Sequence, residues 1–377
     1  MALISLIALV FSVALFLTGC MPLPDDEAAW VLQDLAAGEG DSRLKQRTPE
    51  PARRTVTYTV QGRTYRGHLY VPAQPALAGL VLVPGVAERG WNDPRLVAFA
   101  TTLARVRFLV LVPDLPNLRA LRVQAEDAQG VADAFVQLRA RAEFPASGRA
   151  GIGAFSYAVG PAVLAALKPA INEQVDFVLG VGGYHDLNRV INFFTTGYFE
   201  QEERWRYMTP NSYGKWVFVY GNATLLSDPT DRTMLRRIAQ RKLDNDQADI
   251  VDLTTQLTLK GQSLLNLLEN RDPERTPALL AGLPAAIRAE VDALNLADKD
   301  LSRLRARLIL LHGTDDNIIP YTETLALATS VPPGQSDVFL IEGLAHVDVQ
   351  PLRLDRRSLW RAIGVLLAQR KDAGEED

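Results

Sequence analysis

Short apolar runs that alternate with helical patterns constrain the fold of this chain more than any other feature. Each run ends near Gly, Pro or His, and helical periodicity fills the intervals at 96–105, 126–141 and 161–167. Continuous apolar strands between helices are typical of a mostly parallel sheet that is covered on both faces. The strands predicted in this way lie at 80–83, 108–112, 149–153, 177–181 and 308–311.

The segments before and between these runs complete the predicted architecture. Alternating residues at 55–60 and 64–70 predict an opening hairpin. Residues 186–303 interrupt the alternation without a clear strand and show helical periodicity around 232–241, 248–268 and 284–294. We therefore predict an α/β fold, a mostly parallel doubly wound sheet with an inserted helical cap. Trp205, Tyr207 and Trp216 are interpreted as core residues of that cap.

Composition excludes several classes of function. The 377 residues carry a net charge of −4 and no long basic run, which argues against nucleic-acid binding. The single cysteine excludes an internal disulfide, and the four histidines are not spaced like metal ligands. We therefore expect no metal and no cofactor. Nothing in the sequence fixes the oligomeric state.

A serine stands where the strand at 149–153 turns into a helix. The segment reads Ala154-Phe155-Ser156-Tyr157-Ala158, which is similar to the Gly-x-Ser-x-Gly nucleophile elbow with alanine in both glycine positions. Alanine is the next smallest residue, so the close approach of strand and helix remains feasible. Serines also commonly cap helices, and this motif alone does not establish a nucleophile.

Two later segments supply the partners that a nucleophilic serine needs. The sequence His312-Gly313-Thr314-Asp315-Asp316-Asn317-Ile318-Ile319-Pro320 resembles the His-Gly-x-x-Asp-x-x-Val-Pro segment of α/β-hydrolases, whose aspartate orients the catalytic histidine. The resemblance assigns that role to Asp316, with Asp315 as the nearest alternative and Asp186 as a distant one. A further strand at 338–341 precedes His346, where members of this fold carry the base.

The order Ser156, Asp316, His346 is that of the α/β-hydrolase superfamily, which the chain resembles over roughly 55–186 and 301–369. Esterases and dienelactone-hydrolase-like enzymes belong to it. The resemblance implies an oxyanion hole in the loop after the strand at 80–83. Because Pro84 has no N–H, the expected donors are the backbone N–H groups of Val86 and Tyr157.

The N-terminus resembles a bacterial lipoprotein signal peptide. Residues 2–17 are almost all apolar, and Leu17-Thr18-Gly19-Cys20 is similar to a lipobox, in which the cysteine becomes lipidated after cleavage just before it. An uncleaved membrane anchor is the alternative. Met21, in place of Asp, indicates the outer membrane in Gram-negative lipoproteins, so we expect an envelope protein anchored through Cys20 that faces the periplasm.

These predictions divide the chain into five parts. They are a signal peptide (1–19), a lipid-anchored tether (20–54), the first part of the hydrolase core (55–185), the helical cap (186–303) and the second part of the core (304–377). The predicted function is hydrolysis of a carboxylic ester in a small, partly apolar acyl substrate through an acyl-enzyme. The same triad serves peptidases, thioesterases and acyltransferases, and a non-catalytic binding lipoprotein is a further alternative.

Overall fold

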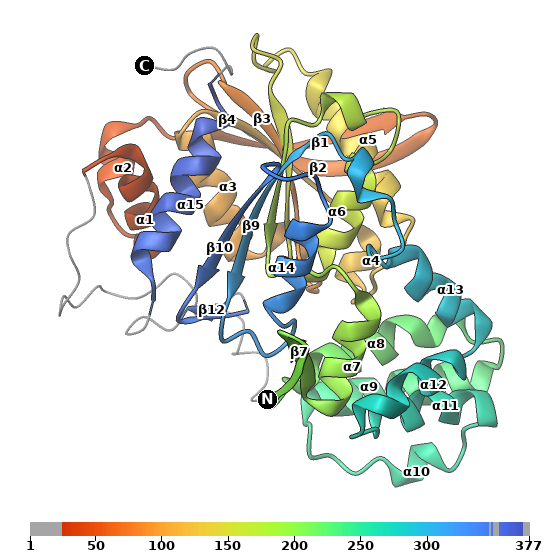
Figure 1. Ribbon diagram of the computed structural model, residues 1–377. Coiled ribbons are helices and arrows are strands. Elements are labelled where there is room, and N and C mark those ends of the chain that lie inside the picture. Colours follow the sequence, from red (N-terminus) through yellow and green to blue (C-terminus); the bar gives the residue numbers. More distant parts are fainter. Residues whose placement is uncertain (1–24, 347, 350–353, 372–377) are drawn as a thin grey trace.

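An eight-stranded sheet forms the centre of the molecule in the computed structural model, which describes residues 25–346, 348–349 and 354–371 (Figure 1). Its strand order is β1-β2-β4-β3-β5-β6-β9-β10. The two opening strands run antiparallel, as β2 also does to β4, and all other neighbours are parallel. This confirms the predicted sheet. Its strands are β1 (Ala52–Val60), β2 (Arg63–Val71), β3 (Ala78–Val83), β4 (Phe108–Pro113), β5 (Ala150–Phe155), β6 (Phe177–Val181), β9 (Arg307–Gly313) and β10 (Ser336–Ile341).

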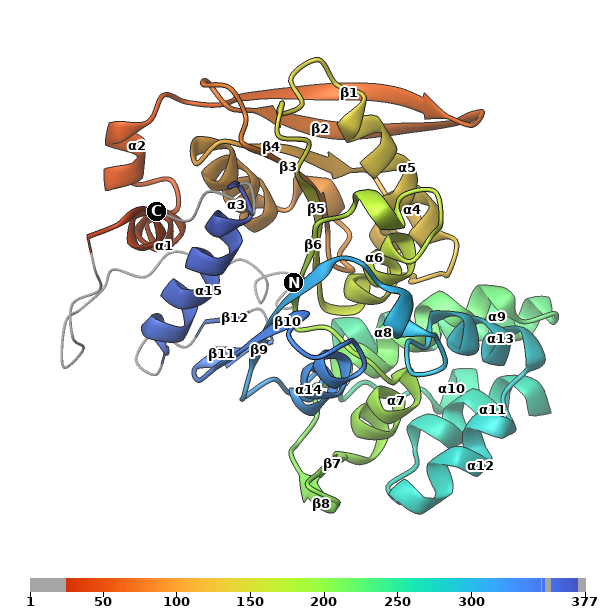
Figure 2. The ribbon, with the colours of Figure 1, turned by 45° about the horizontal axis from the view of Figure 1, so that its top comes forward.

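Helices cover both faces of this sheet, which confirms the doubly wound architecture (Figure 2). Successive side chains of β3 point to opposite faces of the sheet and enter two different cores. Leu80 and Leu82 belong to one buried cluster, whereas Val81 and Val83 belong to the other. The first cluster includes residues of α1 (Glu27–Ala37), α3 (Pro94–Arg105) and α15 (Arg356–Ala368). The second includes residues of α5 (Asp127–Arg139), α6 (Val159–Ala166) and α14 (Thr322–Thr329).

Residues 25–54 do not form the tether predicted for 20–54, and for this part the interpretation is wrong. They fold into α1 and α2 (Arg43–Arg47) and lead into β1. The carboxylate of Asp34 in α1 is buried and accepts hydrogen bonds from the hydroxyls of Ser42 (2.5 Å) and Thr102 in α3 (2.6 Å). At the other end of α1, the indole N–H of Trp360 in α15 donates to Asp26. The segment is therefore part of the core domain.

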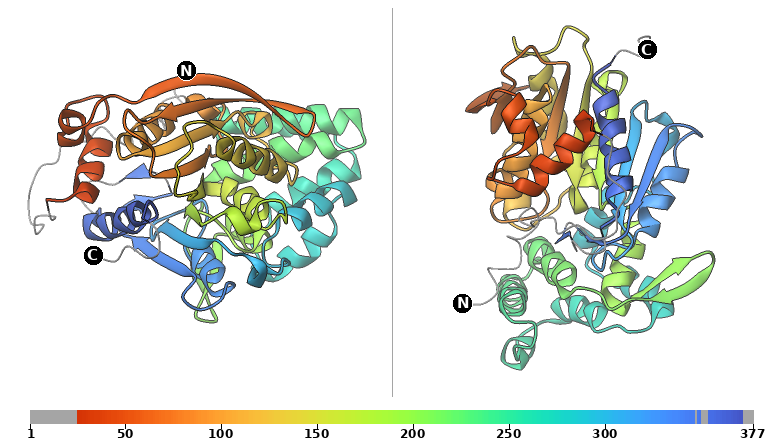
Figure 3. Two further views of the ribbon diagram at one scale, coloured as in Figure 1. Left: turned by 90° about the horizontal axis from the view of Figure 1, so that it is seen from above. Right: turned by 90° about the vertical axis from the view of Figure 1, so that its left-hand side faces the viewer.

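The insertion between β6 and β9 lies beyond the carboxyl ends of the parallel strands (Figure 1), and the right-hand view of Figure 3 shows it as a separate layer. The segment 248–268, which was predicted as one helical region, contains two helices that are separated at residues 255–258. At the break, the backbone N–H and hydroxyl of Thr258 donate to the buried carboxylate of Asp231. The boundaries at 186 and 303 stay a prediction. The helices are α7 (Leu187–Thr196), α8 (Ser212–Asn222), α9 (Pro229–Asp244), α10 (Val251–Thr254), α11 (Leu259–Leu268), α12 (Thr276–Ala281) and α13 (Ala285–Leu294).

The insertion also contains a β-hairpin that the sequence patterns did not predict. Strands β7 (Tyr198–Gln201) and β8 (Arg204–Tyr207) pair antiparallel around Glu202 and Glu203, whose φ angles are 51° and 59°. Left-handed turn residues are usually Gly, Asn or Asp, so this turn lacks the usual signal. The hairpin leaves Trp205 and Tyr207 exposed, and their assignment to the cap core is wrong, whereas Trp216 is buried as predicted.

No helix within the described ranges is both long and apolar enough to cross a bilayer. The predicted signal peptide and Cys20 lie outside those ranges. The short strands β11 (Leu344–Ala345) and β12 (Asp348–Val349) follow β10 and shape the loop that carries His346.

Candidate active site

Ser156 lies at a sharp turn between β5 and α6. Its φ is +56°, a left-handed conformation that is uncommon for a residue other than glycine and that is typical of a strained strand-to-helix elbow. Ala154 and Ala158, which stand in the usual glycine positions, are both fully buried. The tightest contact is at Gly160, where a Cβ atom would lie 2.0 Å from the hydroxyl oxygen of Tyr184. The elbow therefore needs glycine two residues beyond the usual position.

His346 connects the serine to a buried carboxylate. Its Nε2 atom lies 2.8 Å from the Oγ atom of Ser156, and its Nδ1 atom lies 2.7 Å from the Oδ2 atom of Asp316. The loop that carries His346 passes over the end of β9, where a Cβ atom at Gly313 would lie 1.5 Å from the carbonyl oxygen of Leu344. Glycine is thus required at the end of β9 for the histidine to reach the serine.

Asp316 is held by donors on both carboxylate oxygens. Its Oδ1 atom accepts the backbone N–H groups of Ile318 (2.8 Å) and Ile319 (2.9 Å), and the side chain is fully buried. Burial by itself raises the pKa of this carboxyl group. The attraction of His346 and the hydrogen bonds from His312 and His346 outweigh burial and hold the pKa of Asp316 well below its usual range. Asp316 is therefore a carboxylate at neutral pH.

His312 is a third member of this network that the sequence reasoning did not assign. It is fully buried, and its Nε2 atom lies 3.1 Å from the Oδ2 atom of Asp316 and 2.9 Å from the carbonyl oxygen of Ile319. A carbonyl only accepts hydrogen bonds, so Nε2 carries the proton and donates. The Nδ1 atom pairs with the hydroxyl of Thr324 at 2.7 Å. The sequence feature that could have identified His312 was its place as the histidine of the His-Gly segment before Asp316.

The alternative acids have other partners. Asp315 accepts the backbone N–H of Gly343 at 3.2 Å and braces the loop before the histidine. Asp186 caps α7 by accepting the backbone N–H of Asn188 at 2.9 Å. Of the three carboxylates, Asp316 is the one whose hydrogen bond to His346 is observed.

The predicted oxyanion donors lie on two segments that meet at the elbow. The loop after β3 approaches the end of β5, since a Cβ atom at Gly85 would lie 3.7 Å from the carbonyl oxygen of Phe155. Val86 follows in that loop, and its carbonyl accepts the hydroxyl of Tyr213 in α8 at 3.2 Å. Tyr157 directly follows the serine. The oxyanion role of the Val86 and Tyr157 N–H groups stays a prediction.

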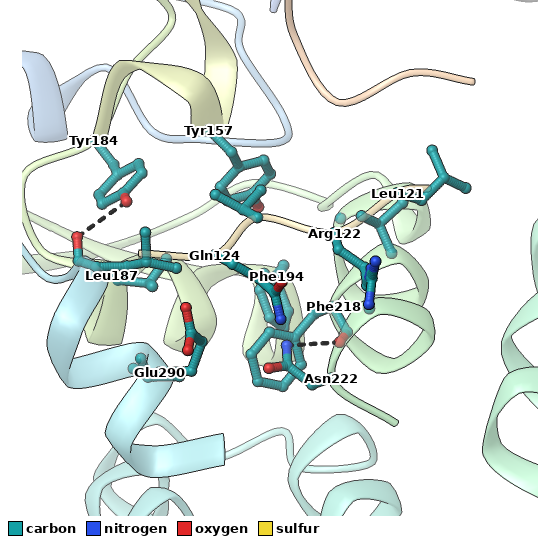
Figure 4. A pocket seen from close by; sticks show the side chains of 16 residues that line it. Leu121, Arg122, Gln124, Tyr157, Tyr184, Leu187, Phe194, Phe218, Asn222 and Glu290 are labelled. Carbon is teal, nitrogen blue, oxygen red and sulfur yellow. Dashed lines mark hydrogen bonds between the residues drawn. The ribbon is translucent and has the colours of Figure 1, made fainter. Parts of the chain in front are cut away.

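A cavity of about 50 Å³ lies between the elbow and the insertion (Figure 4). Tyr157 and Tyr184 line it from the core side, and residues 121–124 and helices α7, α8 and α13 supply the rest of its wall. Within the described part of the chain, no group of three or more His, Cys, Asp or Glu side chains is arranged to hold a metal ion.

The chain is similar in sequence to a known hydrolase over a short stretch. No protein-family model matches the chain. A stretch of 62 residues is 37% identical to 2-hydroxy-6-oxo-2,4-heptadienoate hydrolase from Pseudomonas putida, and it covers 16% of this chain and 22% of that enzyme. The chain therefore matches only about a fifth of the length of this curated relative.

Two solved structures resemble the chain over most of its length. The alpha/beta hydrolase GrgF from Penicillium sp. sh18 gives a TM-score of 0.53 at 15% identity, over 85% of this chain and 99% of that one. A candidate hydrolase from Legionella pneumophila gives a TM-score of 0.51 at 11% identity, over 87% and 90% of the two chains. At these identities the likeness shows the fold.

Proposed function

Because the chain has the α/β-hydrolase fold, we propose that it is a serine hydrolase that cleaves carboxylic esters through an acyl-enzyme on Ser156. The observation that carries this proposal is the chain of hydrogen bonds from the Ser156 hydroxyl through both nitrogens of His346 to Asp316. A serine hydroxyl becomes a competent nucleophile when an imidazole accepts its proton and a carboxylate orients that imidazole.

The proposed reaction has two half-reactions. The Nε2 atom of His346 accepts the proton of Ser156 as Oγ attacks the ester carbonyl, and the backbone N–H groups of Val86 and Tyr157 stabilise the oxyanion. The resulting imidazolium, whose charge the Asp316 carboxylate offsets, then protonates the leaving alkoxide. In the second half-reaction, water loses a proton to His346 and attacks the acyl-enzyme. The bond between the acyl carbon and Oγ then breaks, His346 returns the proton to Oγ, and the acid is released.

Labelling with a fluorophosphonate probe tests the nucleophile. We expect the folded protein to be labelled, Ser156→Ala to lose the label, and Ser302→Ala, which alters an exposed serine, to keep it. With p-nitrophenyl esters, His346→Ala should lower kcat by roughly 10⁴-fold or more, because the parts of a triad act as a unit. An unlabelled wild-type protein, or a label that persists in Ser156→Ala, contradicts the proposal.

A series of p-nitrophenyl esters of increasing acyl length tests the substrate class. The insertion and its apolar side chains favour a small, partly apolar acyl group, because burial of each methylene contributes about 0.8 kcal/mol. We expect kcat/KM to rise with chain length up to the size of the pocket and then to fall. Amide or thioester analogues that react faster than every ester would point instead to a peptidase or thioesterase.

We further propose that Cys20 is lipidated and that the enzyme is bound to the periplasmic side of the outer membrane. Since α1 packs on the core, only residues 20–24 would separate the lipid from the folded domain, a reach of roughly 17 Å at most. The active site would then lie close to the membrane. Cys20→Ser should move the protein from the membrane to the soluble fraction and remove the lipid mass in a mass spectrum. An unchanged mass and unchanged membrane binding would contradict this anchor.

A further inference from the structure

One face of α8 forms a wall of the cavity beside Tyr157. The residues of α8 that line the cavity follow helical spacing, so they share one side of the helix. The stripe begins with one glycine and has a second glycine one residue before its end. A Cβ atom at Gly214 would lie 3.2 Å from the hydroxyl oxygen of Tyr157, and one at Gly221 would lie 3.0 Å from the carbonyl oxygen of Leu121. The missing side chains allow α8 to approach these core residues, and the stripe consists of Gly214, Val217, Phe218, Gly221 and Asn222.

Two buried polar atoms of the residues that line this cavity have no hydrogen-bond partner within the described part of the protein. They are the hydroxyl of Tyr157 and the Nε atom of Arg122. Other polar groups of the same wall are satisfied, since Tyr184 donates to the carbonyl of Leu294 and Asn222 donates to that of Phe218 (Figure 4). Buried polar groups are nearly always paired, so the two exceptions indicate a site for a partner.

Both unpaired groups are able to donate a hydrogen bond. Burial raises the pKa of Tyr157 well above its ordinary value, so the hydroxyl keeps its proton. The guanidinium Nε–H of Arg122 donates only. Gln124 extends its side-chain amide toward the same space from a third position (Figure 4). The volume of about 50 Å³ exceeds the roughly 10–15 Å³ that one water molecule requires. Glu290 also lines the cavity, and its carboxylate already accepts the backbone N–H of Ala125 at 2.5 Å. The ligand group that matches the two unpaired donors is a hydrogen-bond acceptor.

We propose that this cavity binds a carbonyl or carboxylate oxygen on the acyl chain of the substrate, with Tyr157 and Arg122 as its donors. The inference rests on the proposed function, since it places the far end of an ester that Ser156 attacks. Tyr157 connects the two sites, because its main chain follows the nucleophile and its side chain lines the cavity. The substrate class is thus an oxo-acyl or dicarboxylate monoester instead of a plain alkyl ester.

Matched esters measure this preference directly. The p-nitrophenyl esters of pentanoate and 4-oxopentanoate, and of hexanoate and 5-oxohexanoate, differ within each pair only by a ketone oxygen, and the monoester of glutarate carries a carboxylate. We expect kcat/KM of the wild-type protein to favour the oxygen-bearing ester. Tyr157→Phe should lower the oxo/alkyl ratio about 10-fold, and Arg122→Met should lower the glutarate/alkyl ratio by roughly 100-fold. Any effect on the backbone donor of Tyr157 cancels in the ratio.

Tyr184→Phe is the matched control, because its hydroxyl borders the same cavity but is already paired with Leu294. It should lower the thermal midpoint and leave both ratios unchanged, whereas Tyr157→Phe should leave the midpoint unchanged or raise it. Fluorophosphonate labelling distinguishes a failure of this inference from a failure of the proposed function. Labelled protein that prefers no oxygen-bearing ester, or a preference that survives in Tyr157→Phe and Arg122→Met, overturns this inference alone. A protein that is not labelled overturns the proposed function as well.

Discussion

The clearest quantitative prediction concerns His312, the buried histidine behind the proposed triad. Its Nε2–H donates to both Asp316 and the carbonyl of Ile319, and its Nδ1 pairs with Thr324. His312→Asn keeps a polar group near the position of Nδ1 but is too short to reach Asp316. His312→Gln extends an amide to the position of Nε2 and restores a donor there. The two variants therefore separate the hydrogen bond to Asp316 from the presence of a polar side chain.

The expected cost follows from the contacts that each variant loses. A hydrogen bond to a buried carboxylate contributes about 1.5–3 kcal/mol, and a buried carbonyl left without a donor costs about 1–3 kcal/mol. His312→Asn loses both, so the free energy of unfolding should fall by roughly 2.5–6 kcal/mol. This is a large share of the ~5–15 kcal/mol that stabilises a typical domain. His312→Gln should lose about 1–2 kcal/mol, since it keeps a donor to Asp316 but fits the site less well.

Urea unfolding followed by tryptophan fluorescence measures the loss of stability, and the rate of fluorophosphonate labelling measures the state of the proposed triad. In the folded fraction we expect His312→Asn to label about 10-fold more slowly than His312→Gln, because Asp316 loses one of the donors that fix its position. Equal stability and equal labelling rates for the two variants would refute the reasoning. In that case His312 would only fill space behind the site.

Three further predictions concern contacts around the site. Gly313→Ala should abolish labelling, because its Cβ would collide with the loop that carries the histidine, whereas Gly364→Ala, which has open space in α15, should label normally and gain stability. Burial raises the pKa of Asp127 from 3.8 to about 6, so its contribution to stability is complete below pH 4 and is lost as pH rises through 6. Asp127→Asn should remove this decline in urea midpoints measured from pH 4 to 7. Tyr213→Phe removes the hydrogen bond to the carbonyl of Val86 and should lower kcat for p-nitrophenyl esters several-fold with little change in KM. An unchanged kcat would show that the proposed oxyanion role of the Val86 loop does not depend on the insertion.

The sheet was predictable because its signal is local. Runs such as 80–83 and 108–112 are apolar throughout, and no other common element of that length buries every side chain. The order of the runs along the chain also located the turn at Ser156 and the loops that carry Asp316 and His346. What the patterns could not supply was the distance between these side chains. That distance depends on Gly313 and on a loop that crosses the end of β9.

The features that the sequence patterns missed have different physical causes. The polar stretch at 38–54 indicates a tether, but the pattern does not show that Asp34 in the preceding helix is buried against Thr102 of another helix. The hairpin at 198–207 was missed because glutamates occupy left-handed turn positions. The cavity beside Tyr157 exists only once α8 packs against the elbow. Neither hydropathy nor motif spacing contains this information.

The two alanines at the elbow illustrate how a motif relates to the contacts that produce it. Glycine is usual beside the nucleophile where strand and helix crowd, yet Ala154 and Ala158 are accommodated here with no exposed surface. The crowding has moved to Gly160, which cannot carry a side chain because the Tyr184 hydroxyl lies in that space. Tyr184 is in turn fixed by the carbonyl of Leu294 in the insertion. The elbow at Ser156 therefore forms without Gly-x-Ser-x-Gly, because the contact that excludes a side chain lies at Gly160 instead.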